Sequence, residues 1–307
     1  MRRAALLACA ALALAGCGFG PGDEREGGAE LRVTRDFGQE RLAQASVDRI
    51  REDQTVMRLL QSEQEVETRY GGRFVQSIDG LAGGGPVGRE DWFFFVNGIE
   101  SSESAAEFEV SPGDVIQWDY RDWRGAMQIP AIVGAWPEPF VSGHKGERLP
   151  TRVECEEERG AACEEVKRRL GDAGALVSGS ALGTNTSPRD ALLRVVVGTW
   201  DGLRFIRAIQ AIEDGPEASG VFARVREDRL ELLDESGEPA RVAPPGSGLV
   251  GMTGLEDQAL VFFVTGLDEA GVKAAARALD ERTLADAFAV AATPEGPVRL
   301  PVREEGE

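Results

Sequence analysis

Hydrophobic and polar residues alternate along short segments in the first third of the chain. Residues 31–37 and 74–78 follow this pattern, which is typical of strands with one buried face. Residues 92–96 are apolar on both faces, and the Asn97-Gly98 pair after them favours a tight turn. A strand with two apolar faces is expected in the centre of a sheet, or packed against a second part of the molecule.

One segment between these strands has the period of a helix instead. The apolar residues of 56–60 share one helical face, and Asp53 or Thr55 can cap its start. Residues 115–120 then alternate again, as a last strand would. The order of elements over residues 31–125 predicts an α+β domain: a small β-grasp-like sheet covered by one helix.

From about residue 151 the pattern changes to strands that alternate with helices. Thr151–Cys155 is predicted as a short strand and residues 162–170 as a helix. Residues 192–209 and 259–279 resemble each other, because each has an apolar strand, a Gly/Thr turn, an aspartate that can cap, and a helix. Residues 151–307 are therefore expected to form a C-terminal α/β domain with parallel central strands.

The two strand-to-helix turns of this second domain are a possible ligand site. Ligands of α/β sheets often bind beyond the carboxyl ends of the strands. The turns carry no phosphate-binding loop, however, and simple helix caps explain their polar residues better. The residues concerned are Thr199, Asp201, Thr265, Gly266 and Asp268.

The N-terminus has the pattern of a secretory signal. Residues 1–16 combine a basic start with a short apolar run that ends in Leu-Ala-Gly before Cys17. This ending resembles a lipobox, which implies lipidation of Cys17; the alternative is an ordinary signal peptide with a coincidental cysteine. Residues 17–30 are rich in glycine and charge and are predicted as a flexible tether. We expect the protein at the cell membrane, lipid-anchored on the extracytoplasmic face.

Charge and cysteine content narrow the function classes. The net charge of −19 over 307 residues argues against nucleic acid as a partner. With Cys9 in the signal and Cys17 assigned to lipid, Cys155 and Cys163 remain as an even pair. In an oxidising compartment such a pair predicts a disulfide. A metal pair is the alternative, but the single histidine, His144, makes it improbable, and no metal is predicted.

Aromatic residues gather where the two predicted domains join. Residues 126–150 contain several prolines and are predicted as an ordered linker. Aromatic rings beside aspartate and arginine can hold a planar ligand, but they can also pack two domains together, and both interpretations stay open. The candidate ligand-binding residues are Trp92, Trp118, Tyr120, Asp122, Trp123, Trp136 and Phe140.

Three motifs in a fixed order carry a family resemblance. They are GGRFVQSIDGL at 71–81, WFFFVNG at 92–98 and PGDVIQW at 112–118. Together they resemble the transcobalamin-like C-terminal domain of bacterial surface lipoproteins, over residues 31–123. The resemblance implies a β-rich fold, an extracytoplasmic location and a possible corrinoid ligand. The large helical barrel that completes the cobalamin site of the animal relatives is absent from this chain.

These observations predict a binding protein rather than an enzyme. The sequence contains no Gly-x-Ser-x-Gly nucleophile motif, although a carboxylate pair for glycoside cleavage stays possible. We expect a membrane-anchored lipoprotein that captures a small molecule, corrinoid-like by resemblance, and passes it to a transporter. It needs no cofactor for this role. The alternative is a cell-surface module that binds a protein or an envelope polymer and has no small ligand.

Overall fold

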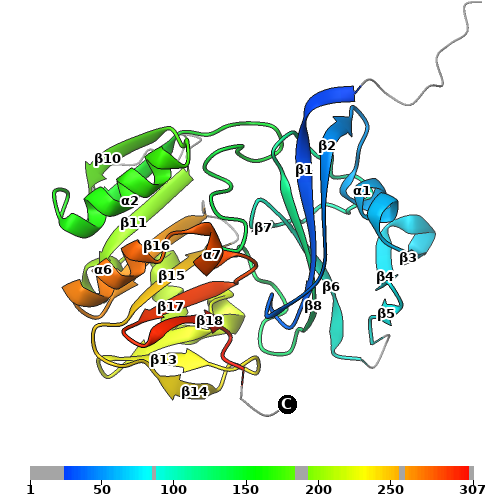
Figure 1. Cartoon of the computed structure of the whole chain (residues 1–307). Coiled ribbons are helices and arrows are strands. Elements are labelled where there is room, and N and C mark those ends of the chain that lie inside the picture. Colours follow the sequence, from blue (N-terminus) through cyan, green and yellow to red (C-terminus); the bar gives the residue numbers. More distant parts are fainter. Residues whose placement is uncertain (1–23, 85–87, 184–192, 256–259, 304–307) are drawn as a thin grey trace, which may run out of the picture.

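The computed structural model describes residues 24–84, 88–183, 193–255 and 260–303 (Figure 1). The predicted signal peptide and Cys17 lie outside these residues. Strand β1 (Glu24–Arg35) begins within the segment predicted as a tether, so residues 24–30 are corrected to strand. They pair with β2 (Glu40–Arg51). The pairing register between β1 and β2 shifts between Glu26 and Gly27, as it does at a β-bulge.

The first sheet has the order β2-β1-β8-β6-β7. Strands β1 and β8 are parallel neighbours, whereas the other neighbouring pairs are antiparallel. Thr55 caps helix α1 by accepting a hydrogen bond from the backbone N–H of Arg58, as the sequence predicted. The remaining elements of this part are α1 (Val56–Glu63), β3 (Val66–Arg69), a short 3-10 helix (Tyr70–Gly72), β4 (Phe74–Ile78), β5 (Leu81–Ala82), β6 (Glu90–Val96), β7 (Ile99–Glu100) and β8 (Val115–Asp122).

The second sheet has seven strands in the order β10-β9-β11-β16-β15-β17-β18. The first four are parallel, as predicted for the central strands, and the last three join antiparallel. The strands are β9 (Thr151–Cys155), β10 (Val177–Ala181), β11 (Leu193–Thr199), β15 (Gly248–Thr253), β16 (Val261–Gly266), β17 (Ala289–Thr293) and β18 (Gly296–Leu300).

Helices and a small third sheet cover the two faces of the second sheet (Figure 1). One face packs on α2 (Ala161–Asp172) and α6 (Glu269–Arg277), and α7 (Glu281–Leu284) lies beside them. The other face packs on the short helices and on a sheet in the order β12-β13-β14. These elements are α3 (Trp200–Leu203), α4 (Arg207–Gln210), a 3-10 helix (Ala211–Asp214), α5 (Pro216–Ser219), β12 (Ala223–Arg226), β13 (Arg229–Leu233) and β14 (Pro239–Val242).

The predicted disulfide is present. Cys155, the last residue of β9, is bonded to Cys163 in the first turn of α2. The bond therefore ties the strand to the helix that covers it. The mixed α+β class is also confirmed, with most of the elements being strands. Among the residues that the structure describes, no helix is both long and apolar enough to cross a membrane.

The two sheets share one hydrophobic cluster, in addition to a cluster of their own on the other face of each sheet. Phe37 and Phe95 of the first part pack with Phe222 and Phe288 of the second, at ring distances of 4.9 to 5.4 Å. Residues 129–140 are largely buried, and the segment 126–150 contributes residues to the clusters on both faces of the second sheet. The segment predicted as a linker is thus part of the joint between the two sheets.

Candidate functional site

The aromatic residues proposed as ligand contacts in the first part are core residues. Trp92, Trp118 and Tyr120 are 5%, 3% and 7% exposed, in the cluster under α1. The Trp118 ring stacks on Phe94 at 5.0 Å, and the Trp92 indole N–H donates to the backbone oxygen of Leu81. With this little surface, none of the three can contact a ligand from solvent, so the ligand interpretation is corrected for them.

Trp136 and Phe140 lie in a different core. They pack on Phe262 in the cluster between the second sheet and its helices, and are 6% and 1% exposed. Their predicted role as ligand contacts is corrected for the same reason. Trp123 is half-buried, and its backbone N–H donates to Arg89. Of the seven proposed residues, Asp122 is the one that lines a charged cleft between the two parts of the chain.

Two of the polar residues at the strand-to-helix turns, Thr199 and Asp268, act as caps, whereas the buried Thr265 hydroxyl has no hydrogen-bond partner in the described residues. Thr199 accepts a hydrogen bond from the N–H of Gly202 at the start of α3, and Asp268 accepts one from Gly271 at the start of α6. Asp201 is exposed and pairs with Arg204 at 3.5 Å. This outcome supports the interpretation of these turns as simple caps rather than a ligand site.

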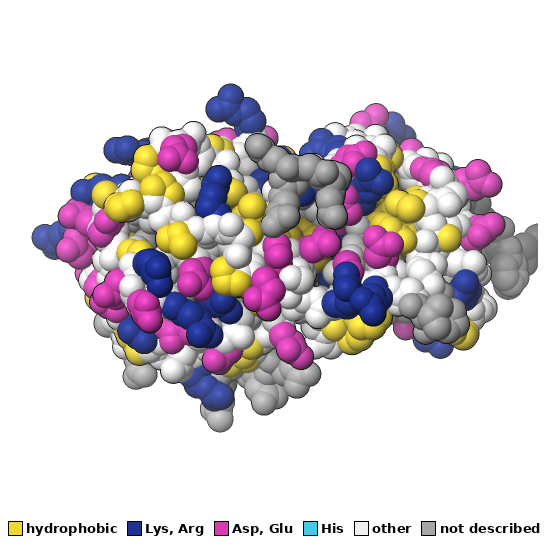
Figure 2. Space-filling model, turned by 90° about the horizontal axis from the view of Figure 1, so that it is seen from below, with side chains coloured by type: hydrophobic (Ala, Val, Ile, Leu, Met, Phe, Trp, Pro, Cys, Tyr) yellow, Lys and Arg dark blue, Asp and Glu magenta, His cyan; other side chains and the backbone are white. Residues whose placement is uncertain are grey.

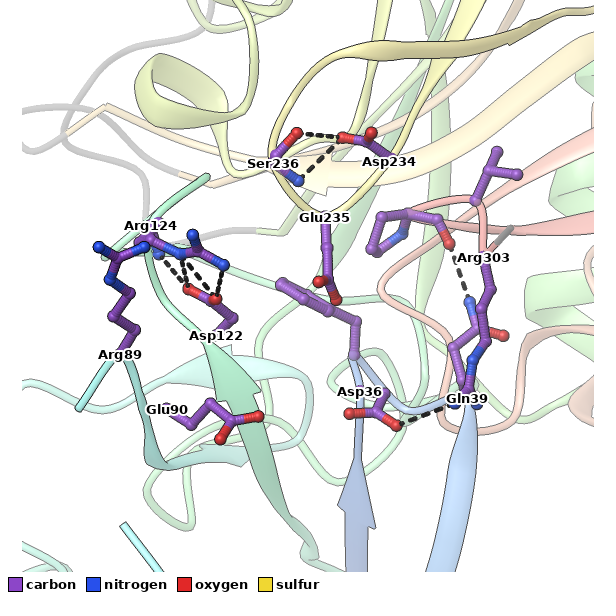
Figure 3. Close-up of a pocket in the computed structure, with 13 residues that line it drawn as sticks. Asp36, Gln39, Arg89, Glu90, Asp122, Arg124, Asp234, Glu235, Ser236 and Arg303 are labelled. Atoms are coloured by element: carbon purple, nitrogen blue, oxygen red, sulfur yellow. Dashed lines mark hydrogen bonds and ion pairs between the residues drawn. The ribbon is translucent and has the colours of Figure 1, made fainter. Parts of the chain in front are cut away.

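A charged cleft of about 710 Å³ lies where the first sheet meets the C-terminal part (Figure 3). Its walls are the β1–β2 turn, the start of β6, the end of β8, the β13–β14 turn and the segment after β18. This end of the molecule carries intermixed acidic and basic side chains (Figure 2). The lining residues are Asp36, Phe37, Gln39, Arg89, Glu90, Asp122, Arg124, Asp234, Glu235, Ser236, Pro301, Val302 and Arg303.

One ion pair dominates the β8 side of the charged cleft. Arg124 donates to both carboxylate oxygens of Asp122, at 3.0 and 2.7 Å from its Nε. Burial alone would raise the pKa of Asp122, but the hydrogen bonds and charge of Arg124, helped by Arg89, lower it below the usual value. The carboxylate of Asp122 is therefore ionised, and the positive charge of Arg124 balances it.

Glu235 faces this pair from the β13–β14 turn (Figure 3). Oδ1 of Asp234 accepts hydrogen bonds from the backbone N–H groups of Ser236 and Glu238. These bonds fix the conformation of the turn and therefore the position of the Glu235 backbone. Burial raises the pKa of Glu235, and the negative charges of Asp122 and Asp36 raise it further, against the opposing effect of Arg124. No described residue holds its carboxylate by a hydrogen bond or ion pair.

Gly125 allows the turn to approach the end of β8. A Cβ at this position would lie 2.1 Å from the backbone oxygen of Glu235 and 3.3 Å from the Phe222 ring. Only glycine leaves room for this contact. The glycine therefore brings together side chains that are more than a hundred positions apart in the sequence.

Hydrogen bonds to the chain's C-terminal segment fix the opposite wall. The Gln39 side-chain amide donates to the Pro301 oxygen at 2.9 Å, and the Val302 N–H donates to Leu233 at 2.8 Å. Arg303 approaches Asp36 at 3.7 Å. The β1–β2 turn and the end of the second sheet thus form one rim.

A buried carboxylate behind this rim holds the β1–β2 turn in place. Asp119 of β8 is fully buried and accepts hydrogen bonds from the Thr34 hydroxyl at 2.7 Å and from the N–H groups of Phe37 and Gly38 at 3.1 and 2.8 Å. Burial raises its pKa to about 6, and these donors and Arg121 offset part of that effect. Asp119 thus positions two residues next to Asp36, although it does not line the cleft itself.

Arg121 and Glu100 continue this buried network. The Arg121 guanidinium has no exposed side-chain surface, lies 3.8 Å above the Phe93 ring and donates to the Ala126 oxygen at 2.9 Å. It approaches Glu100 at 3.6 Å, and Glu100 accepts from the Ile129 N–H. Burial raises the pKa of Glu100 to about 7, against the opposing effect of Arg121. The network anchors the segment 126–150 to the first sheet.

Sequence reasoning missed most of the charged cleft. Arg89, Glu90 and Arg124 resembled ordinary surface charges, and Asp234 and Glu235 belonged to an unremarkable turn. The Asp-Glu-Ser-Gly sequence at 234–237 was the available signal, because it predicts a turn that exposes its second residue. Within the described residues, no group of three or more His, Cys, Asp or Glu side chains is placed to hold a metal ion.

Comparisons with known proteins match part of the chain to one family model. Residues 53–122 match the model of a domain of unknown function (DUF4430), which is less than a quarter of the chain. The match includes α1, β6 and β8, and it covers most of the segment that carries the transcobalamin-like motifs. No curated protein matches the chain.

Two solved structures show limited similarity. One is described as a putative metal binding protein from Ruminococcus gnavus ATCC 29149, with 19% identity, a TM-score of 0.25 and coverage of 32% of this chain and 98% of that chain. The other is haptocorrin in complex with Cbi, with 16% identity, a TM-score of 0.27 and coverage of 34% of this chain and 26% of that chain. Scores this low carry no argument about the ligand.

Proposed function

We propose that this protein is an extracytoplasmic binding protein and that its ligand site is the charged cleft. The observation that carries the proposal is the cleft itself, which is built by both parts of the chain and lined by eight charged side chains. Binding sites occur preferentially where two structural units meet, and they use a few fixed polar groups for specificity. The proposal includes no catalytic role.

The lining favours a polar small molecule. Asp119 fixes the β1–β2 turn and Gly125 fixes the approach of the β13–β14 turn, so the charged groups have defined positions. A preorganised polar site binds without a large ordering cost. The sequence motifs suggest a more specific ligand, a corrinoid. A corrinoid would contact this lining through the amide groups around its ring.

A thermal-shift screen tests the proposal. The full chain in detergent is heated with cobinamide, cobalamin and a panel of small charged and neutral metabolites. We expect at least one compound to raise the melting temperature, and Ser236→Trp, which fills the cleft from its rim, to abolish that shift. A shift that is unchanged in a folded Ser236→Trp variant would place the site elsewhere, and no shift with any compound would refute the binding role.

We also propose that lipid on Cys17 anchors the protein and that the ligand passes to a transporter. Strand β1 begins at Glu24, so six residues separate the proposed anchor from the folded part. They span at most about 20 Å, which keeps the protein close to the membrane. Intact mass spectrometry of the mature chain should show an acylated Cys17. Cys17→Ser should release the protein from membranes, and equal membrane retention would contradict the anchor.

A second candidate function, binding of a protein or envelope polymer, has one specific observation in its favour. Tyr70 is 81% exposed and Phe74 is 41% exposed, and their rings lie 6.4 Å apart. The neighbouring strands β3 and β4 lie on the side of the molecule away from the second sheet (Figure 1). Tyr70 also has a φ of 52°, which is costly for a bulky residue and is found most often at functional positions. Loss of surface retention in Tyr70→Ser, with ligand binding unchanged, would favour this function.

A further inference from the structure

Charge balance in the charged cleft suggests a ligand class. The lining contains two more carboxylates than arginines. Asp122 is neutralised by Arg124, which leaves Asp36, Glu90 and Glu235 with weaker partners. Arg35 and Arg303 each lie 3.7 Å from Asp36, and the Tyr120 hydroxyl is 3.4 Å from Glu90. These contacts are too long for strong charge-assisted hydrogen bonds.

Glu235 is the least compensated of these groups. Its carboxylate has no hydrogen-bonding or ion-pairing partner among the described residues. Asp122, Asp36 and Asp234 act on it with like charge, and the charge of Arg124 offsets part of this repulsion. Like charges near one site raise its free energy, and a bound cation would relieve that repulsion. The ligand-free cleft is therefore poised for a positive group.

The position of Glu235 is built into the fold. The Asp234 side chain closes the β13–β14 turn through three hydrogen bonds from Ser236 and Glu238. Gly125 allows the Glu235 backbone to lie against the end of β8. The backbone that carries Glu235 is therefore held in place next to the other carboxylates, while the Glu235 side chain itself is exposed at the cleft.

We propose that the charged cleft selects a ligand with an organic ammonium or guanidinium group, which Glu235 receives together with Glu90 and Asp36. This inference rests on the proposed binding function and deepens it. A bare metal ion is a poorer fit, because no set of three ligating side chains converges anywhere in the described chain. Arg89, on the same side of the cleft as the Asp122–Arg124 pair, can in addition receive an anionic part of the same ligand.

Calorimetric titration with three matched probes tests the inference. The probes are 1,5-diaminopentane, 1,5-pentanediol and glutarate, which share a carbon chain and differ in charge. We expect saturable binding of the diamine, weakened by salt, and little binding of the other two. Glu235→Gln should weaken diamine binding about tenfold or more, the effect of losing one charged hydrogen-bonding partner.

Glu238→Gln is the control, because Glu238 belongs to the same turn but does not line the cleft. It should bind the diamine like the wild type. Binding of glutarate or the diol in preference to the diamine would overturn the inference, and so would equal diamine binding in Glu235→Gln or no diamine binding at all. The binding function itself would fail only if the wider screen, with cobinamide included, also found no ligand.

Discussion

The aromatic core under α1 and the charged cleft lie along the same strand but have opposite character. Trp118 and Tyr120 of β8 are enclosed among apolar side chains, whereas Asp122, two residues further, reaches the cleft. The sequence indicates the aromatic region as the ligand site, because tryptophans are common in such sites. The structure indicates the charged cleft instead. The difference teaches that aromatic residues in a small sheet can all be needed to fill its core.

The largest effect is expected when a side chain of the aromatic core is truncated, which tests whether that region is structural. Trp118→Ala should lower the free energy of unfolding by about 3–5 kcal/mol, because it removes a large side chain that is 3% exposed. Trp118→Phe should cost much less, since it keeps an aromatic ring and removes a buried indole N–H that has no hydrogen-bond partner in the described residues. Urea unfolding measures both.

If Trp118 were a ligand contact instead, the result would differ. Trp118→Phe would then weaken binding while leaving stability unchanged, and our assignment of the residue to the core would be wrong.

The buried charges between the two regions predict a pH dependence of stability. The pKa of Glu100 is raised from 4.5 to about 7 in the folded state. Between pH 4.5 and pH 7 the folded state therefore binds more protons than the unfolded state. This contribution, up to about 3 kcal/mol, is fully present below pH 4.5 and is lost as the pH rises through 7. Asp119, with a pKa raised to about 6, acts in the same direction.

Urea unfolding at pH 5 and at pH 8 measures the effect. Glu100→Gln should reduce the loss of stability between these values, because glutamine does not titrate. Stability that rises from pH 5 to pH 8 in the wild type but not in the variant would contradict the burial of Glu100 as the dominant cause.

Gly125 connects the end of β8 to the cleft and gives a smaller predicted effect. Gly125→Ala should cost about 1–3 kcal/mol and weaken ligand binding, because the new Cβ would displace the Glu235 backbone. Gly171→Ala is the matched control: that glycine lies in α2 with no heavy atom within 4 Å of a new Cβ. It should leave binding unchanged and stability equal or up to about 1 kcal/mol higher. Equal behaviour of the two variants would show that the close contact is unimportant.

The smallest stability effect is expected in the cleft itself. Glu235→Gln removes like-charge repulsion at an exposed position and should change the free energy of unfolding by no more than about 0.5 kcal/mol, toward higher stability. A clear loss of stability would mean that Glu235 has a structural partner, and its assignment to ligand recognition would then fail.

Local patterns predicted the elements because their causes are local. Thr55 caps α1, and Asn97 and Gly98 adopt the positive φ values of 54° and 76° expected of their turn. The Cys155–Cys163 disulfide was predicted because these two cysteines remain as an even pair in a compartment that is expected to be oxidising.

The cleft could not be predicted in the same way. The contact between Gly125 and Glu235 depends on how two sheets pack, and no periodicity records it. Whether Trp136 faces a ligand or Phe262 is also decided by packing, since both environments favour the same aromatic side chain. The sequence therefore indicates which residues are apolar or charged, but not which of them meet.

Hydrogen-exchange mass spectrometry with 1,5-diaminopentane tests the central claim most directly. Exchange of the full chain is compared with and without saturating probe. A ligand in the charged cleft should slow exchange in the β13–β14 turn at 234–238 and in the β1–β2 turn at 36–39, and leave the aromatic segment at 135–140 unchanged. Slower exchange at 135–140 with both turns unaffected would show that the aromatic residues, and not the charged cleft, form the site.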